Sequence, residues 1–124
     1  MRDMTILMDT QQGRPARFLE ALFGRGVNVE AGCLFPRTEG RVMHIAVEDG
    51  DVDKVHDVAA ELGVAVADDR ECVVVPPNFP GGVPAIGTRV AEAGVTVYLA
   101  YFGTNGQVVL SSNDLEKTRA ALGL

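Results

Sequence analysis

The stretch Gly26-Val27-Asn28-Val29 recurs as Gly94-Val95-Thr96-Val97, which is a shift of 68 residues (94 − 26). The same shift superposes residues of matching character elsewhere: Gly13 on Gly81, Phe18 on Ile86, and Leu22 on Val90. A later stretch, Asp51-Val52-Asp53-Lys54, matches Asp114-Leu115-Glu116-Lys117. Because glycines, apolar positions and helix-capping residues coincide in one order, the sequence predicts an internal duplication.

The first copy has the patterns of a strand, a helix, two strands, a helix and a strand. Residues 4–8 predict a strand, and a helix with one apolar stripe is predicted from Pro15 by Phe18, Leu19, Leu22 and Phe23. Every second residue from Val27 to Phe35 is apolar, which predicts a strand that turns at Glu39-Gly40 and returns over 41–47. Asp51 is expected to cap the second helix, and residues 64–66 begin the last strand.

The second copy repeats this order. It begins with a strand over 71–75, a helix over 84–93 and a strand over 96–102. Asn105-Gly106 predicts a two-residue hairpin turn, because both residue types tolerate a positive φ. The return strand over 108–111 leads to a helix that Asp114 caps and that ends near Leu122. No final strand is evident, so the last position in this sheet is expected to be empty or filled by another segment.

The repeated βαββαβ unit resembles the ACT domain, because it has Gly-x-x-x-x-apolar in the first turn and helix and Gly-Val-Asn-Val at the second strand. The duplicated form resembles the small stand-alone tandem ACT proteins of bacteria, and the resemblance covers almost the whole chain. It implies an α+β fold of two ferredoxin-like units, residues 1–69 and 70–124, packed side by side and sharing an extended sheet. Each unit is expected to have an antiparallel sheet with helices on one face.

The resemblance also implies a non-catalytic regulatory protein that binds a small ligand, usually a free amino acid, where two units meet. The first loop of the family reads Asp/Asn-x-Pro-Gly, and Asn78-Phe79-Pro80-Gly81 matches this pattern. The corresponding Thr10-Gln11-Gln12-Gly13 keeps only the glycine. We therefore expect the second loop to contribute more to ligand binding than the first. The alternative is a protein interaction module that has lost its ligand site.

The stretch from Pro77 to Ala85 also has the chemistry of a carboxylate cradle. A turn before a helix exposes unpaired N–H groups, the helix dipole adds partial positive charge, and Gly81-Gly82 allows close approach of a ligand. Asn78 can bond a carboxylate or an ammonium group, and Asn28 and Thr96 would complete a site with the other unit's loop. The predicted ligand-binding residues are Thr10, Gln12, Gly13, Asn28, Asn78, Phe79, Gly81, Gly82, Val83 and Thr96. The alternative is that Gly81-Gly82 is a plain tight turn and Asn28 a polar turn residue.

Composition and spacing argue against other classes of function. The 11 basic and 17 acidic residues give a net charge of −6, which disfavours nucleic acid as a partner. No apolar segment reaches the ~20 residues of a membrane span, and Met1-Arg2-Asp3-Met4 lacks the character of a signal peptide. His44, His56 and the two cysteines have no metal-ligand spacing, so we expect no metal and no cofactor. A small ferredoxin-like enzyme is the least favoured alternative, because no nucleophile–base pair is evident.

Two further features concern assembly and location. Residues 96–102 are apolar on both faces of the predicted strand, whereas one layer of helices covers only one face of a sheet. We therefore expect a homodimer, or a docked partner such as a regulated enzyme. Cys33 and Cys72 lie in apolar runs without CxxC spacing, which predicts reduced thiols in a cytoplasmic protein.

Overall fold

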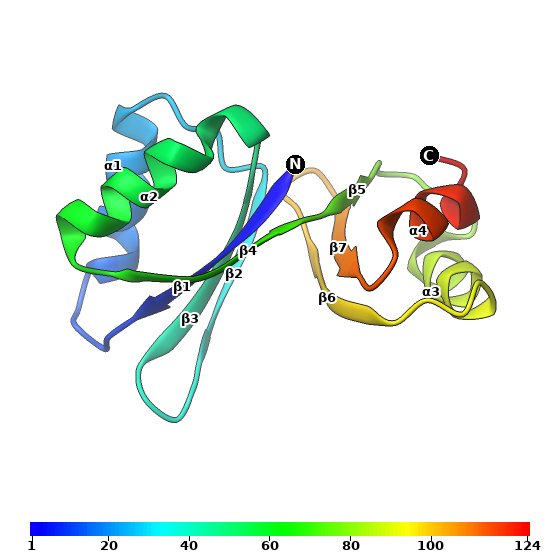
Figure 1. The fold of residues 1–124 in the computed structure, drawn as a ribbon, viewed down its shortest axis with the longest axis horizontal. Helices are drawn as coiled ribbons and strands as arrows, with labels where there is room; N and C mark the ends of the chain where they lie inside the picture. Colours follow the sequence, from blue (N-terminus) through cyan, green and yellow to red (C-terminus); the bar gives the residue numbers. More distant parts are fainter. The chain divides into compact units, whose positions relative to one another are not determined.

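The computed structural model describes all 124 residues of the chain, which divide into two units, Met1–Arg70 and Glu71–Leu124. The elements of the first (Figure 1) are β1 (Arg2–Met8), α1 (Arg14–Gly24), β2 (Ala31–Pro36), β3 (Arg41–Val47), a 3-10 turn (Asp49–Asp51), α2 (Val52–Leu62) and β4 (Ala65–Glu71). Those of the second are β5 (Val73–Val75), α3 (Gly82–Glu92), β6 (Val97–Phe102), β7 (Val108–Ser112) and α4 (Leu115–Leu122). None of the helices has both the length and the apolar character that crossing a membrane requires.

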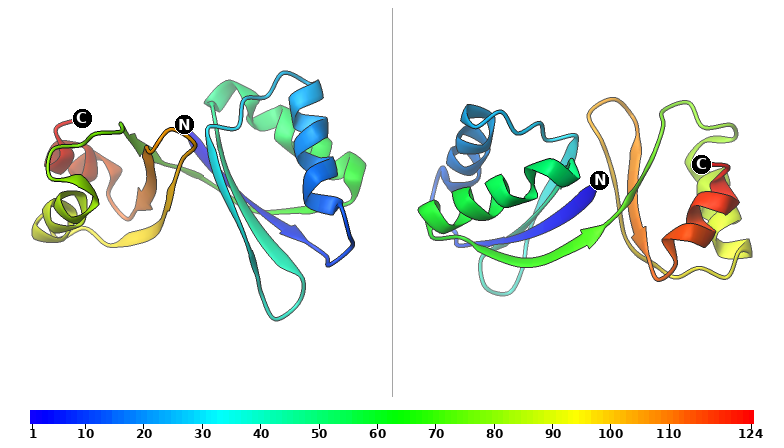
Figure 2. Two further views of the ribbon diagram at one scale, coloured as in Figure 1. Left: turned by 180° about the vertical axis from the view of Figure 1, so that it is seen from behind. Right: turned by 45° about the horizontal axis from the view of Figure 1, so that its top comes forward.

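The first unit is a four-stranded sheet with helices on one face. The strand order is β2-β3-β1-β4, and β3 runs antiparallel to both β1 and β2. Figures 1 and 2 show α1 and α2 side by side on the same face of this sheet. Alternate residues of β1 and β3 point toward these helices. The buried core there consists of Met4, Ile6, Met8, Phe18, Leu22, Val27, Met43, Ile45, Val47, Val55, Val58 and Ala59.

The second unit repeats this architecture with one strand fewer. Its strand order is β5-β7-β6, with β7 antiparallel to both neighbours, and its core consists of Val73, Val75, Ile86, Val90, Val108, Leu110 and Leu122. In the first unit β4 lies outside β1, whereas no strand of the chain lies outside β5, so the last sheet position is empty. These two antiparallel sheets with their helices confirm the predicted α+β class. The sheets are separate, so the single extended sheet that we expected within one chain is not formed.

The duplication is reproduced in the backbone. Helix α1 covers residues 14–24 and α3 covers residues 82–92, which is the same shift of 68 (82 − 14). Each helix follows a left-handed glycine, Gly13 with φ 78° and Gly81 with φ 85°. After each helix the chain closes with equivalent bonds, from Val27 N–H to the Leu22 carbonyl (3.0 Å) and from Val95 N–H to the Val90 carbonyl (3.3 Å). A shift that preserves helix bounds, cap conformation and closing bonds indicates equivalent folding of both copies.

Several local predictions were wrong in detail. The strand predicted from Val27 begins only at Ala31, because Val27 is buried against the core as part of the helix-closing turn. Helix α3 begins at Gly82 rather than at Pro84. Asp114 caps α4 through a bond from Lys117 N–H (3.0 Å), as predicted, but Asp51 makes no such bond because a 3-10 turn precedes α2.

The second hairpin also differs from its prediction. Asn105 does not have a positive φ, and the turn is closed by a bond from Gly103 N–H to the Gln107 carbonyl (2.7 Å), which leaves three residues in the loop. Strand β6 contains an irregularity between Val97 and Leu99, so the simple alternation predicted for residues 96–102 is interrupted at Tyr98. A bulge of this kind re-aims side chains on an edge strand. Val97, Tyr98 and Phe102 are exposed.

Candidate ligand-binding site

The first loop connects β1 to α1 and is held by its own side chains. The Asp9 carboxylate accepts hydrogen bonds from Gln11 N–H (3.0 Å) and from the Arg14 guanidinium (3.2 Å). Arg41 of β3 donates to the carbonyls of Asp9 (2.9 Å) and Gln11 (2.8 Å). The Gln11 N–H, followed by the Arg14 guanidinium, holds the pKa of Asp9 below its ordinary value. The loop around Gly13 is therefore fixed without any ligand.

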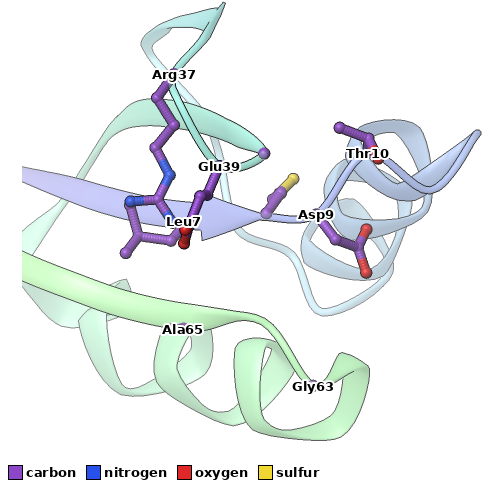
Figure 3. Close-up of a pocket in the computed structure, with 9 residues that line it drawn as sticks. Leu7, Asp9, Thr10, Arg37, Glu39, Gly63 and Ala65 are labelled. Atoms are coloured by element: carbon purple, nitrogen blue, oxygen red, sulfur yellow. The ribbon is translucent and has the colours of Figure 1, made fainter.

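A cavity of about 450 Å³ lies beside this loop (Figure 3), and we call it the hairpin pocket. It is lined by Leu7, Met8, Asp9, Thr10, Arg37, Glu39, Gly40, Gly63 and Ala65. Three segments that are distant in the sequence meet there: the end of β1, the turn between β2 and β3, and the connection from α2 to β4. Of the predicted site residues, Thr10 lines this cavity, whereas Gln12 and Gly13 do not.

The second loop, between β5 and α3, has fewer internal bonds. Asn78 is the one residue other than glycine with a positive φ (63°), and Gly81 and Gly82 are also left-handed. Gly82 N–H donates to the Phe79 carbonyl (2.8 Å), so this donor is already used. The N–H group of Val83 has no hydrogen-bond partner, as is common in a first helical turn, and Pro84 has no N–H. The loop thus presents a free backbone donor at the positive end of α3.

The side chains of this loop have different surroundings. Phe79 is half-buried against the core of the second unit, and the Arg89 guanidinium lies 5.2 Å from the centre of its ring. This packing gives Phe79 a structural contact that the sequence did not predict. Val83 is exposed, as are Asn78 and the two glycines. A β-carbon on Gly81 would lie 2.7 Å from the Ala85 β-carbon, so glycine is required there for space as well as for its positive φ.

Asn28 and Thr96 lie apart from the loops of their own units. Arg41 of β3 pairs with both Met8 and Pro36, so the last residues of β1 and β2 share one end of the sheet. Thr10 follows β1 at that end, whereas Asn28 precedes β2 at the other, about 20 Å away along a six-residue strand. A site that combines such a loop with Asn28 therefore requires two different units.

The second unit has the same arrangement. Val108 of β7 pairs with both Val75 and Phe102, so Asn78 follows β5 at that end and Thr96 precedes β6 at the other. Both polar residues already have local bonds. The Asn28 amide donates to Glu30 (2.5 Å), and Thr96 N–H donates to the Asn113 side chain (2.9 Å). Their predicted ligand role stays a prediction.

A second surface feature was not predicted from the sequence. A groove of about 640 Å³ lies beside α1 and the segment that follows it, and is lined by Ala16, Leu19, Glu20, Phe23, Val27, Asn28 and Val29. Leu19 and Phe23 were predicted to belong to the buried stripe of this helix, but Phe23 is 83% exposed. Only Phe18 and Leu22 of that stripe are buried. The sheet covers a narrower part of α1 than the spacing of apolar residues indicated.

A buried polar pair lies on the sheet of the first unit. The His44 imidazole Nδ1 lies 3.0 Å from a carboxylate oxygen of Asp3, which is fully buried, and Phe35 stacks on the imidazole ring. Cys33 pairs with His44 across the strands. Burial raises the pKa of the Cys33 thiol, so this sulfur is not an activated thiolate at neutral pH. The cluster therefore has the character of a packed polar contact, and neither cysteine forms a disulfide.

Several solved structures share the fold of this chain over almost its full length. Protein BT0572 from Bacteroides thetaiotaomicron has a TM-score of 0.78 at 22% identity, covering 98% of this chain and 85% of that one. The ligand-free regulatory subunit of aspartate kinase from Thermus thermophilus has a TM-score of 0.69 at 18% identity, covering 98% and 89%. The corresponding subunit from Thermus flavus has a TM-score of 0.70 at 17% identity, covering 98% and 88%. Neither a family model nor a curated protein matches the sequence. The likeness therefore concerns the ACT-like fold.

Proposed function

We propose that this chain is a non-catalytic regulatory protein that binds a free amino acid through its ACT-like units. The observation that carries the proposal is the free Val83 N–H at the start of α3, in the same loop as the exposed Asn78 side chain. A free N–H group at the positive end of α3 suits a carboxylate, and the Asn78 amide suits either charged end of an amino acid. The second loop is therefore the main binding loop, as its family pattern predicts.

The first loop has a weaker role in this proposal. Arg41 and Arg14 already engage the carbonyls of Asp9 and Gln11 and the Asp9 carboxylate, so the loop that contains Thr10, Gln12 and Gly13 is less free to adapt to a ligand. Asn28 or Thr96 from another unit completes the site. A partner protein, such as an enzyme that the chain regulates, then recognises the ligand-bound state of the chain. The fold, which it shares with two regulatory subunits of aspartate kinase, supports this role.

A thermal-shift screen of the common amino acids tests the proposal. A ligand at about 100 times its Kd stabilises the folded state by about 2.7 kcal/mol. For a chain of this size we expect the midpoint of unfolding to rise by about 10 °C. A flat response to every amino acid at millimolar concentration would contradict the proposal.

Such a flat response would favour a second candidate function, an interaction module without a ligand. Its supporting observation is the apolar surface of the chain, because Phe23 on α1 and Tyr98 and Phe102 on β6 are all exposed. The same residues of β6 support a homodimer under either function.

A further inference from the structure

The hairpin pocket has a fixed frame. Gly40, at the turn between β2 and β3, has φ 83°, and a β-carbon there would lie 2.2 Å from the Met8 carbonyl oxygen. The turn therefore lies directly against the end of β1, and Arg37 N–H closes it by donating to the Gly40 carbonyl (3.1 Å). Arg41 ties the next segment to the first loop through two bonds. A frame fixed in this way is already organised for a ligand.

Of the charged side chains that line the pocket, one already has partners within the protein and two do not. The Asp9 carboxylate is taken by Gln11 N–H and by Arg14, whose guanidinium also donates to the Leu62 carbonyl (2.7 Å). Arg37 and Glu39, in contrast, form no ion pair and no side-chain hydrogen bond, either with each other or with any other residue. In the view of Figure 3 both side chains run from the turn toward Leu7. The pocket thus has one uncommitted cation and one uncommitted anion.

These two charges select a class of ligand. The Arg37 guanidinium can bind a carboxylate through two parallel hydrogen bonds, and the Glu39 carboxylate can accept from an ammonium group. A simple anion would be repelled by Glu39 and a simple cation by Arg37, whereas a zwitterion satisfies both. Leu7 and Ala65 provide an apolar floor for a small side chain. The volume of about 450 Å³ lies in the usual range of small-molecule sites.

We infer that the hairpin pocket is a second binding site, for a small zwitterionic α-amino acid whose carboxylate binds Arg37 and whose ammonium group binds Glu39. This site lies wholly within the first unit. It is separate from the second loop. Thr10 of the first loop lines it, but neither the loop pattern nor the family resemblance assigns a role to Arg37 or Glu39.

The test uses the full chain labelled with ¹⁵N and three probes: L-alanine, N-acetyl-L-alanine and L-alaninamide. We expect L-alanine to shift the amide signals of Gly40, Gly63 and Ala65. Both derivatives should bind at least about tenfold more weakly, because each has lost one of the two charges. Glu39→Gln should weaken L-alanine but strengthen N-acetyl-L-alanine, an anion that Glu39 repels. Arg37→Gln should weaken L-alanine but strengthen L-alaninamide, a cation that Arg37 repels.

Two variants serve as matched controls for the loss of charge. Arg17→Gln on α1 and Glu48→Gln before α2 remove exposed, unpaired charges outside the pocket, so both should bind L-alanine as the parent chain does. The amide spectrum of each variant shows whether it is folded. The inference is overturned if L-alanine leaves the three amides unshifted, or if folded Arg37→Gln and Glu39→Gln chains bind L-alanine with parent affinity.

The two sites are separable in this experiment. A loss of second-loop binding in Asn78→Ala with intact shifts at Gly40 and Ala65 supports the hairpin pocket, whatever happens to the proposed function. A loss of the pocket shifts in Asn78→Ala contradicts it, because one event at the second loop would then explain both signals.

Discussion

Arg14 donates to the Asp9 carboxylate over 3.2 Å, and this ion pair closes the loop between β1 and α1. The same carboxylate accepts a bond from Gln11 N–H, so its charged form has two partners in the folded state. The corresponding loop of the second unit has no such pair. This difference between two copies of one unit leads to the first prediction.

We predict that the pKa of Asp9 in the folded chain is below its ordinary value, because the Gln11 N–H and then the Arg14 guanidinium stabilise the carboxylate. A carboxyl group whose folded pKa is lowered contributes stability above its unfolded pKa, and this contribution is lost as the pH falls through the folded pKa. In Arg14→Gln the pKa of Asp9 should rise toward its ordinary value but stay below it, because the Gln11 N–H remains. Titration of the carboxyl carbon by NMR measures both values. An unchanged pKa in the variant would contradict the role of Arg14.

The second prediction compares the two loops in ligand binding. Asn78→Ala should weaken the ligand found in the thermal-shift screen by roughly 10- to 100-fold, because each hydrogen bond to a charged group contributes about 1–3 kcal/mol. Thr10→Ala should have a smaller effect. Both changes lie in exposed loops, so the fold should remain. Calorimetric titration of the two variants measures the affinity of each for the ligand. Loss of binding in Thr10→Ala alone would show that the first loop, and not the second, is the main binding loop.

A third prediction concerns the two left-handed glycines before α1 and α3. Gly13→Ala should cost about 1–2 kcal/mol of unfolding free energy, because its φ of 78° is unfavourable for alanine but its surroundings are open. Gly81→Ala should cost more, since the new β-carbon would also lie 2.7 Å from that of Ala85. Urea unfolding of the two variants gives the comparison. Equal costs would show that α3 shifts to make room.

The fourth prediction is that the chain forms a homodimer through β6. Light scattering at micromolar concentration should give about twice the chain mass. Tyr98→Asp or Phe102→Asp should weaken the dimer, because each would bury an unpaired charge in the interface. Phe23→Asp on α1 is the matched control, since it places the same charge on another exposed aromatic position. A dimer that is lost only in Phe23→Asp would place the interface on α1.

Much of the fold could be predicted because the sequence contains the same pattern of elements twice. The order of elements, the glycines before the first helix of each unit and the Asp114 cap all depend on contacts within a few residues. Local signals of this kind are repeated in both copies, and agreement between the copies strengthens each of them. The errors occurred where tertiary contacts decide the outcome, as at Val27, which is buried outside any strand.

The candidate sites were less accessible to sequence reasoning. Arg37 and Glu39 have the pattern of a solvated charged turn, and only the topology of the sheet brings them beside Leu7 and Ala65. The partial burial of Phe79 depends on the packing of α3 and Arg89 around it, which no local pattern encodes. A loop motif can indicate where donors are free, but a pocket formed by three segments has no signature in any one of them.

The two bonds from Arg41 to the first loop bear on how the two copies diverged. Val108 pairs with the last residue of β5, as Arg41 pairs with the last residue of β1. A valine side chain cannot hold loop carbonyls, so the second loop lacks the clamp that fixes the first. After a duplication, the loop of one copy can become fixed in one conformation while the loop of the other copy can still change its conformation. In this chain Arg41 on a neighbouring strand and the Arg14–Asp9 pair fix the first loop, whereas the conformation of the second loop depends on its own turn residues.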